Sequence, residues 1–284
     1  MGLNINWYPG HMKKTHEAIK KNLSLVDFVI EIIDARIPLS SSNPMIQDAL
    51  EGKPKLILLN KSDLADEKAT EEWVRYFSKG DTLAIPYNSL SNKNINKIVK
   101  AAEDLMKDKV TKQSEKGLNT GSFNAMVVGI PNVGKSTFIN NISGKRALKV
   151  GNRPGVTKVN QWLRIHEKLN LLDTPGVLWP KFEKEEALNL AFTGAIKDEI
   201  MDVETLALKL IERLNSIDEN ILAERYGVDK GLTALQSMEE IGRKRGALMK
   251  FGEVDYTKVA GIVLDEFRKG TLGRITLEQC NGKL

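Results

Sequence analysis

The sequence predicts an α/β protein whose mostly parallel sheet has helices on both faces and is followed by an all-helical C-terminal domain. Three observations predict this fold. Six short apolar runs alternate with helical stretches between residues 28 and 172, which is typical of a parallel sheet. A glycine-rich loop at residues 129–136 follows one of these runs and opens a helix. Beyond Pro180 the strand signals fade and helical patterns dominate.

The expected strands are the six apolar runs. They lie at residues 28–33, 55–59, 83–86, 123–128, 162–165 and 169–172. Near the C-terminus, Asp255 is a plausible helix N-cap and Gly270 a plausible stop. The apolar residues between them fall on one face of that helix: Val259, Ile262, Val263 and Phe267.

The loop at residues 129–136 reads Gly-Ile-Pro-Asn-Val-Gly-Lys-Ser, a complete phosphate-binding motif. Its glycines let backbone N–H groups turn toward phosphates, and the following helix adds the positive end of its dipole. Lys135 can reach the β and γ phosphates, and the Ser136 hydroxyl can ligate Mg²⁺. The other residues expected to contact the nucleotide here are Asn132, Val133, Gly134 and Thr137. The motif predicts a nucleotide without choosing its base.

A second motif, Asn60-Lys61-Ser62-Asp63, selects guanine. It follows an apolar run and so lies at a strand end, where open α/β sheets bind ligands. Asp63 can accept hydrogen bonds from the ring N–H and the exocyclic amine of guanine, a donor pair that adenine lacks. Asn60 can bond the opposite edge of the base while the Lys61 stem covers its face. A solvated loop is the alternative for these four residues taken alone.

Three further elements complete a predicted GTP site. Asp173 ends the last apolar run and is placed to hold Mg²⁺ through water. Gly176 belongs to the same Asp-Thr-Pro-Gly motif and is placed to donate its N–H to the γ phosphate. Thr157 lies between the two phosphate motifs and can give the metal a second hydroxyl. Asn88 and Ser89 stand where a backbone N–H would meet guanine O6, although Ser-Ala is the commoner pair there.

The guanine selector precedes the phosphate-binding loop by about seventy residues, so the order of the motifs is that of a circularly permuted P-loop GTPase domain. The chain closely resembles the ribosome biogenesis GTPase A family over its whole length. The resemblance is carried by Trp7-Tyr-Pro-Gly-His-Met12, Asp34-Ala-Arg-Ile-Pro38, Leu178-Trp-Pro-Lys181 and Thr193-Gly-Ala-Ile196. It implies GTP-dependent maturation of the large ribosomal subunit, with rRNA and ribosomal proteins of its precursor as partners.

The change from alternating strands and helices to helices alone predicts two domains: a GTPase domain at residues 1–178 and a helical domain at residues 179–284. A polar stretch at about residues 107–121, rich in Lys and Gly, is the expected link between the ancestral termini. The segment after Gly176 leads directly into the helical domain. A change at the γ phosphate is therefore expected to reach that domain by a short covalent path.

The resemblance also bears on catalysis. Val177 stands where Ras-like enzymes place the glutamine that orients the attacking water, and it has no hydrogen-bonding side chain. The resemblance marks His11 as functional, so His11 is the leading candidate for that role; a capping or packing histidine is the alternative, and His16 and His166 are more distant candidates. Asn132 resembles the asparagine of potassium-activated GTPases, which makes K⁺ a candidate cofactor beside Mg²⁺; a loop hydrogen bond is the alternative. No arginine finger can be identified by spacing.

Composition narrows the class of protein. Cys280 is the only cysteine among 284 residues, which excludes an intrachain disulfide and clustered-thiolate zinc sites. There is no apolar segment of signal-peptide length at the N-terminus and no run of about eighteen apolar residues. Asn6 argues against N-myristoylation. We expect a cytoplasmic protein with neither a membrane nor DNA as a partner.

The formal net charge of +5 is unevenly spread. Residues 179–284 hold 16 basic and 19 acidic residues, whereas residues 145–168 hold seven basic residues and one acidic residue. The basic stretch surrounds Thr157, so we expect it to move with the nucleotide state and to bind phosphate backbone; Lys13, Lys14, Lys20 and Lys21 can extend it. The helical domain has one dense basic cluster, residues 243–245 with Lys250, for which a solvated helix face is the alternative.

Three functions follow from these observations. The favoured one is a GTPase that assembles the large ribosomal subunit and whose hydrolysis the ribosomal particle stimulates. A GTP-dependent rRNA-binding scaffold with little hydrolysis of its own is the alternative, suggested by Val177. A signalling or trafficking GTPase is disfavoured by the permuted order and by the absence of lipidation motifs.

Overall fold

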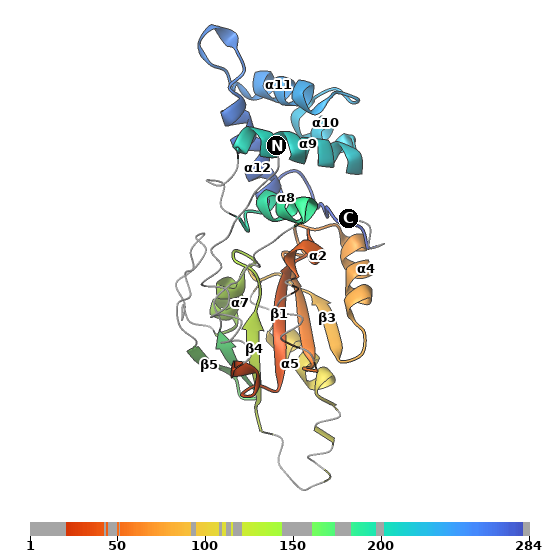
Figure 1. Cartoon of the computed structure of the whole chain (residues 1–284), viewed down its shortest axis with the longest axis vertical. Coiled ribbons are helices and arrows are strands. Elements are labelled where there is room, and N and C mark those ends of the chain that lie inside the picture. The colour runs from red at the N-terminus through yellow and green to blue at the C-terminus, as the bar shows by residue number, and fades with distance from the viewer. Residues whose placement is uncertain are drawn as a thin grey trace.

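The predicted α/β architecture is confirmed. The computed structural model describes residues 21–42, 44, 50, 52–91, 95–107, 110, 111, 115, 121–143, 161–173, 183–196 and 202–280, with Gln161 and Asp173 described by their backbone alone. A sheet carries helices on both faces, and a group of helices stands beyond one end of its strands (Figure 1).

In the part of the chain that the structure describes, six strands form one sheet in the order β3-β2-β1-β4-β6-β5. They are β1 (Phe28–Asp34), β2 (Lys55–Asn60), β3 (Thr82–Pro86), β4 (Phe123–Val128), β5 (Gln161–His166) and β6 (Leu169–Asp173). Every neighbouring pair is parallel except β5 with β6, which is antiparallel and places β5 at an edge. All six expected strands are therefore confirmed, each within one residue at either end.

Strand β1 is central, and all seven of its residues are buried. Phe28 shares a core cluster with residues of α5 (Ile95–Leu105) and α7 (Lys135–Ile142). Ile33 belongs instead to a cluster with Trp73 of α4 (Glu67–Phe77). A parallel strand covered on both faces reads as a continuous apolar run, which is why this pattern was visible in the sequence.

Among the described residues, five α-helices follow the sheet: α8 (Lys184–Phe192), α9 (Val203–Ile217), α10 (Asn220–Tyr226), α11 (Ala234–Arg245) and α12 (Tyr256–Lys269). The Asp255 side chain accepts a hydrogen bond from the Lys258 N–H at 2.9 Å, and Gly270 ends α12 with a φ of 74°. The predicted cap and stop are thus confirmed. Three of the four predicted face residues are buried and Ile262 is half-buried.

After α12 the chain is not helical but returns to the sheet. We refer to residues 271–280 as the C-terminal segment. Its backbone N–H groups at Ile275 and Leu277 donate to the carbonyls of Leu64 and Arg36 at 3.0 and 2.8 Å. The C-terminal segment thereby ties the helical region to the loops after β1 and β2. The expected domain boundary at residue 178 and most of the expected linker lie outside the described residues, so the division of the chain stays a prediction.

Within the described part of the chain, no helix is long and apolar enough to cross a membrane.

Candidate functional site

The carboxyl ends of the five parallel strands lie along one edge of the sheet. Asp34 of β1 is in register with Asn60 of β2, and Val127 of β4 is in register with Asp173 of β6. The loops that follow these strands therefore converge. Although the guanine selector and the phosphate-binding loop are far apart in sequence, only β1 separates their strands in the sheet.

Both glycines of the phosphate-binding loop are required by the backbone. Gly129 has a φ of 152°, and a Cβ placed on it would lie 2.5 Å from the Ile32 carbonyl oxygen. Gly134 has a φ of 104°, and its Cβ would lie 2.4 Å from the Asn60 side-chain nitrogen. A side chain at either position would be strained and would clash. The loop therefore packs tightly on β1 and on the end of β2.

Lys135 and Ser136 begin α7 at the mouth of this loop. The Lys135 ammonium donates to the carbonyls of Gly129 and Ile130 at 3.2 and 3.4 Å, so it lies folded over the loop. Ser136 and Thr137 are half-buried, and no hydrogen bond joins the Ser136 hydroxyl to another described residue. The helix start thus offers N–H groups, an ammonium and a hard oxygen donor, which is the chemistry that a phosphate with Mg²⁺ needs.

Asn60 joins three loops. Its buried side-chain amide donates to the Val133 carbonyl at 2.7 Å. Its side-chain oxygen accepts from the Ser89 N–H at 2.9 Å and from the Ser89 hydroxyl at 2.8 Å. The neighbouring Asn88 accepts from the Leu90 N–H at 2.8 Å. In this structure Asn60 therefore fixes the loop after β3 against the phosphate-binding loop, a role that the motif alone did not suggest.

Of the other residues of the guanine motif, Lys61 and Ser62 make hydrogen bonds within the protein, whereas Asp63 is exposed. Lys61, at a φ of 58°, donates to Asp34 at 2.9 Å and to the Asn132 carbonyl at 3.3 Å. The Ser62 hydroxyl donates to the Tyr87 carbonyl at 2.9 Å. Asp63 is exposed, and its carboxylate makes no hydrogen bond with a described residue. Asp63, the residue expected to select guanine, is thus open to solvent.

Sequence reasoning missed a buried ion pair behind the site. Arg36 binds Asp34 with two nitrogens, at 2.9 and 2.8 Å, and both side chains are buried. Burial alone would raise the pKa of Asp34, but the charges and hydrogen bonds of Arg36 and Lys61 outweigh it and hold that pKa well below the ordinary value of 3.8. Two opposite charges directly after a buried strand were the available signal.

Arg36 also reaches the helical region. It donates to the carbonyls of Phe267 and Arg268 at 3.4 and 3.3 Å and lies over the Phe267 ring, 5.3 Å from its centroid. These carbonyls are at the C-terminus of α12, the negative end of the helix dipole. The Asp34–Arg36 pair therefore connects Lys61 of the guanine motif to the end of α12.

The C-terminal segment holds the loop that carries the guanine motif, residues 60–66. Arg274 donates to the carbonyls of Ser62 and Ala65 at 3.1 and 2.8 Å. Thr276 accepts from the Asp66 N–H at 3.1 Å. The conformation of the guanine loop thus depends on residues more than 200 positions later in the chain, which no local pattern reveals.

Glu278 is a second buried group that the sequence did not reveal. Its carboxylate accepts from the N–H groups of Leu39 and Ser40, at 2.6 and 3.0 Å, and from the Ser40 hydroxyl. It also accepts from the Asn189 side chain of α8 at 3.1 Å. Burial raises the pKa of Glu278 despite these hydrogen bonds. Glu278 caps the short helix α2 (Pro38–Ser41) and joins it to α8.

Several expected site residues lie outside the described part of the chain: His11, Thr157 and Gly176, together with the side chain of Asp173. Among the described residues, no group of three or more His, Cys, Asp or Glu side chains could hold a metal ion.

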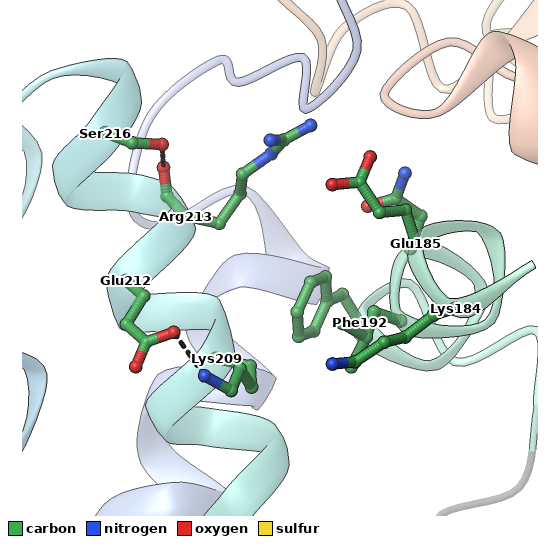
Figure 2. Close-up of a pocket in the computed structure, with 9 residues that line it drawn as sticks. Lys184, Glu185, Phe192, Lys209, Glu212, Arg213 and Ser216 are labelled. Carbon is green, nitrogen blue, oxygen red and sulfur yellow. Dashed lines mark hydrogen bonds and ion pairs between the residues drawn. The ribbon is translucent and has the colours of Figure 1, made fainter. Parts of the chain in front are cut away.

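A cavity of about 340 Å³ lies elsewhere, between α8 and α9 (Figure 2). Phe192 lines it together with charged residues of both helices. Lys209 pairs with Glu212 at 2.6 Å, and Arg213 donates to the Leu277 carbonyl at 2.7 Å. Several of its charges are thus used within the protein, and we assign the cavity no ligand.

Comparison with known proteins agrees with the site geometry. Residues 124–237 match the family described as "50S ribosome-binding GTPase". Ribosome biogenesis GTPase A of Bacillus cereus is 42% identical over 276 residues, covering 96% of this chain and 93% of that protein. The protein of the same name from Bacillus licheniformis is 42% identical and covers 97% of this chain and 98% of that protein.

Solved structures give the same result. GNP-bound YlqF from T. maritima is 28% identical, with a TM-score of 0.64 and coverage of 94% of this chain and 99% of that one. A GDP-bound YlqF structure has a TM-score of 0.66 at the same identity, with coverage of 92% and 98%. The relatives are named as GTPases and match nearly end to end. This chain is therefore a GTPase with circularly permuted motif order, and it belongs to the ribosome biogenesis GTPase A family.

Proposed function

We propose that this protein uses GTP hydrolysis in the assembly of the large ribosomal subunit, and that the ribosomal particle stimulates hydrolysis. The observation that carries the proposal is the Asn60 side chain, which joins the guanine loop, the loop after β3 and the phosphate-binding loop. With these loops joined, a base at Asp63 and phosphates at the start of α7 belong to one ligand.

The phosphates bind the N–H groups of residues 132–137 in this proposal. Lys135 leaves the carbonyls of Gly129 and Ile130 and pairs with the β and γ phosphates. Ser136 holds Mg²⁺ directly and Asp173 holds it through water, and Thr157 adds a second hydroxyl in the GTP state. Mg²⁺ supplies charge neutralisation at the phosphates when it is bound. Gly176 donates its N–H to the γ phosphate.

The base is read by Asp63, whose exposed carboxylate is open to the two adjacent donors of guanine. The Lys61 stem covers the face of the base. Asn88 and Ser89 lie on the side of guanine O6, where the Ser89 N–H would exchange its bond to Asn60 for the base. Asn60 and Ser62 act mainly by holding the loops.

The family description supports the proposed partner. The description "50S ribosome-binding GTPase" supports a large-subunit precursor, with its rRNA and ribosomal proteins, as the partner. The basic stretch at residues 145–168 supplies the positive charge that rRNA phosphates need. We place the protein in the cytoplasm, with neither a membrane nor DNA as a partner. His11 positions the attacking water, and Asn132 is the candidate ligand for K⁺.

A second candidate is a GTP-dependent rRNA-binding scaffold with little hydrolysis of its own. Val177 favours it, because its side chain cannot hydrogen-bond the attacking water. Multiple-turnover hydrolysis of GTP, measured alone, with large subunits and with small subunits, separates the two functions. We expect turnover to rise with large subunits and not with small subunits. Equal turnover in all three conditions would favour the scaffold.

Asp63→Asn tests whether the guanine loop binds the base. This substitution exchanges an acceptor for a donor, so preference should move from guanine toward xanthine nucleotides, which carry a carbonyl in place of the amine. Titration with fluorescent GTP and XTP analogues measures this. Unchanged GTP affinity in Asp63→Asn would remove the guanine loop from the site.

A further inference from the structure

The connection between α11 and α12 stands at the end of the helical region farthest from the sheet (Figure 1). We call residues 247–255 the finger. Its two arms pair: the Asp255 N–H donates to the Ala247 carbonyl at 2.9 Å, and the Met249 N–H donates to the Glu253 carbonyl at 2.7 Å. A single turn at Lys250–Gly252 closes it. The finger is therefore a hydrogen-bonded hairpin.

The base of the finger is anchored in the helical core. Ala247 and Val254 are buried and belong to the main core cluster. A Cβ on Gly242 of α11 would lie 2.5 Å from a methyl carbon of Val254, so glycine is what allows the finger to pack this closely. The tip is thus presented by a fixed support.

The tip exposes apolar side chains to solvent, and its backbone is strained. Phe251 is fully exposed, and Leu248 and Met249 are also exposed. Phe251 has a φ of 71°, in the left-handed region that is unfavourable for a residue with a side chain. Glycine would adopt it without strain. The hairpin therefore does not need Phe251 for its fold, and backbone strain at an exposed aromatic residue points to a contact with another molecule.

Basic residues are concentrated in the sequence around this tip. Residues 243–258 contain five basic residues and two acidic ones, within a region that is acidic overall: Arg243, Lys244, Arg245, Lys250 and Lys258 against Glu253 and Asp255. Asp255 is already used to cap α12.

Two of these cations are turned to solvent. The Arg243 side chain is 65% exposed, and its distance to Glu239 is 3.9 Å, at the limit of an ion pair. Lys250 is exposed within the turn, next to Phe251. Lys244 and Arg245 are held more closely, by the Gly227 carbonyl and by Glu266. Exposed positive charge is therefore present in the finger, at Lys250 next to Phe251, and at the end of α11, at Arg243.

We propose that the finger tip is an RNA contact in which Phe251 stacks on an unpaired base while Arg243 and Lys250 bind the flanking phosphates. Exposed aromatic rings beside cations are how proteins recognise single-stranded and bulged RNA. An apolar pocket of a protein partner would accept Phe251 but would have to desolvate the neighbouring cations. The proposal deepens the proposed function, on which it rests, by naming the surface that reads ribosomal RNA.

The position of the finger gives this contact a route to the nucleotide. The finger ends at the N-cap of α12, and the C-terminus of the same helix carries the carbonyls that Arg36 binds. A helix of 14 residues spans about 21 Å. RNA bound at the finger would therefore act on a rigid rod whose other end lies behind Lys61.

The test uses the full chain and protein-free large-subunit rRNA made by transcription, with affinity measured by filter binding. Phe251→Ala should weaken binding about five- to 150-fold, since stacking on an aromatic ring contributes ~1–3 kcal/mol per base. Phe251→Trp should retain affinity, and Phe251→Leu should lose it like Ala. Leu235→Ala, at an exposed leucine of α11, is the matched control and should bind like the parent.

Two further variants separate stacking from charge and from folding. Arg243→Gln and Lys250→Gln should each lower the slope of log affinity against log salt by about one. Phe251→Gly relieves the strain at φ 71°, so its melting temperature should equal or exceed that of the parent while its RNA affinity falls. Basal GTP hydrolysis should be unchanged in every variant.

Several outcomes would overturn the proposal. If the parent binds rRNA and Phe251→Ala binds it equally well, the finger is not the contact, although the proposed function stands. If Phe251→Leu matches the parent on intact subunits, the finger enters an apolar protein pocket instead. A parent that binds neither rRNA nor large subunits overturns the proposed function together with the RNA contact.

Discussion

The side-chain amide of Asn132 donates a hydrogen bond to the carbonyl of Gly194, at 2.8 Å, and so joins the phosphate-binding loop to the turn after α8. Arg268 of α12 donates to the carbonyls of Ala191 and Phe192 at the same helix end, at 2.9 and 3.0 Å. A shift of the phosphate-binding loop would therefore reach α8 and α12 directly. These contacts give a change at the nucleotide a second path to the helical region, besides the chain after Gly176.

This contact sharpens the potassium prediction. The Asn132 amide nitrogen is a donor, as its bond to Gly194 shows, so the atom that would bind K⁺ is the side-chain oxygen. We expect the parent to turn over GTP faster in K⁺ than in Na⁺, and Asn132→Gly to be equally slow in both. Glycine is a better replacement than alanine, because residue 132 has a φ of 56°, which glycine adopts without strain. Multiple-turnover assays at constant ionic strength measure the difference, and a parent indifferent to the cation would exclude K⁺.

Arg274 predicts that the C-terminal segment contributes to nucleotide affinity. Arg274→Ala removes hydrogen bonds to the Ser62 and Ala65 carbonyls on the guanine loop. We expect the affinities for GTP and GDP to fall together by about fivefold, as loss of roughly 1 kcal/mol implies, because both nucleotides carry the same base. Titration with fluorescent GTP and GDP analogues measures this.

The control for Arg274 is Arg75→Ala, at an exposed arginine in the last turn of α4. It should bind nucleotide like the parent. If Arg274→Ala also bound both nucleotides normally, the guanine loop would hold its conformation without the C-terminal segment.

His11 carries the catalytic prediction. His11→Ala should lower subunit-stimulated turnover while GTP affinity changes little, since a group that positions water acts in the transition state. His166→Ala is the matched control: His166 lies in the edge strand β5, where its ring accepts from the Lys168 N–H at 3.2 Å. Affinity that falls in step with the rate would mark His11 as structural.

The fold was predictable because its signals are local. The central strands β1, β2 and β4 are apolar runs that are buried along most of their length, and Asp255 and Gly270 mark the ends of α12 within one turn. The two nucleotide motifs were visible for the same reason. The contacts that join the sheet to the helical region were not, because their partners are far apart in sequence: Arg36 meets Phe267, and Glu278 meets Ser40. A charged residue in a sequence does not name its partner.

The buried Asp34 predicts a pH dependence of stability. Its pKa is held far below 3.8 in the folded protein, mainly by the charges of Arg36 and Lys61 acting against burial, whereas in the unfolded chain it returns to about 3.8. The unfolded state therefore binds a proton more readily than the folded state. The stabilisation is complete above about pH 5 and is lost progressively as the pH falls through 4 toward the lower folded value.

Asp34→Asn tests this assignment. The substitution leaves the Arg36 charge buried without its carboxylate, so the free energy of unfolding at pH 7 should fall by about 3–5 kcal/mol. The variant should also lose the part of the acid destabilisation that protonation of Asp34 causes in the parent. Asp265→Asn is the control, because Asp265 pairs with Lys269 at the surface, where an ion pair contributes ~0–1 kcal/mol. Urea unfolding between pH 4 and 7 compares the three proteins. If Asp34→Asn unfolds with the stability and the pH profile of the parent, Arg36 is held by the carbonyls of α12 and not by Asp34.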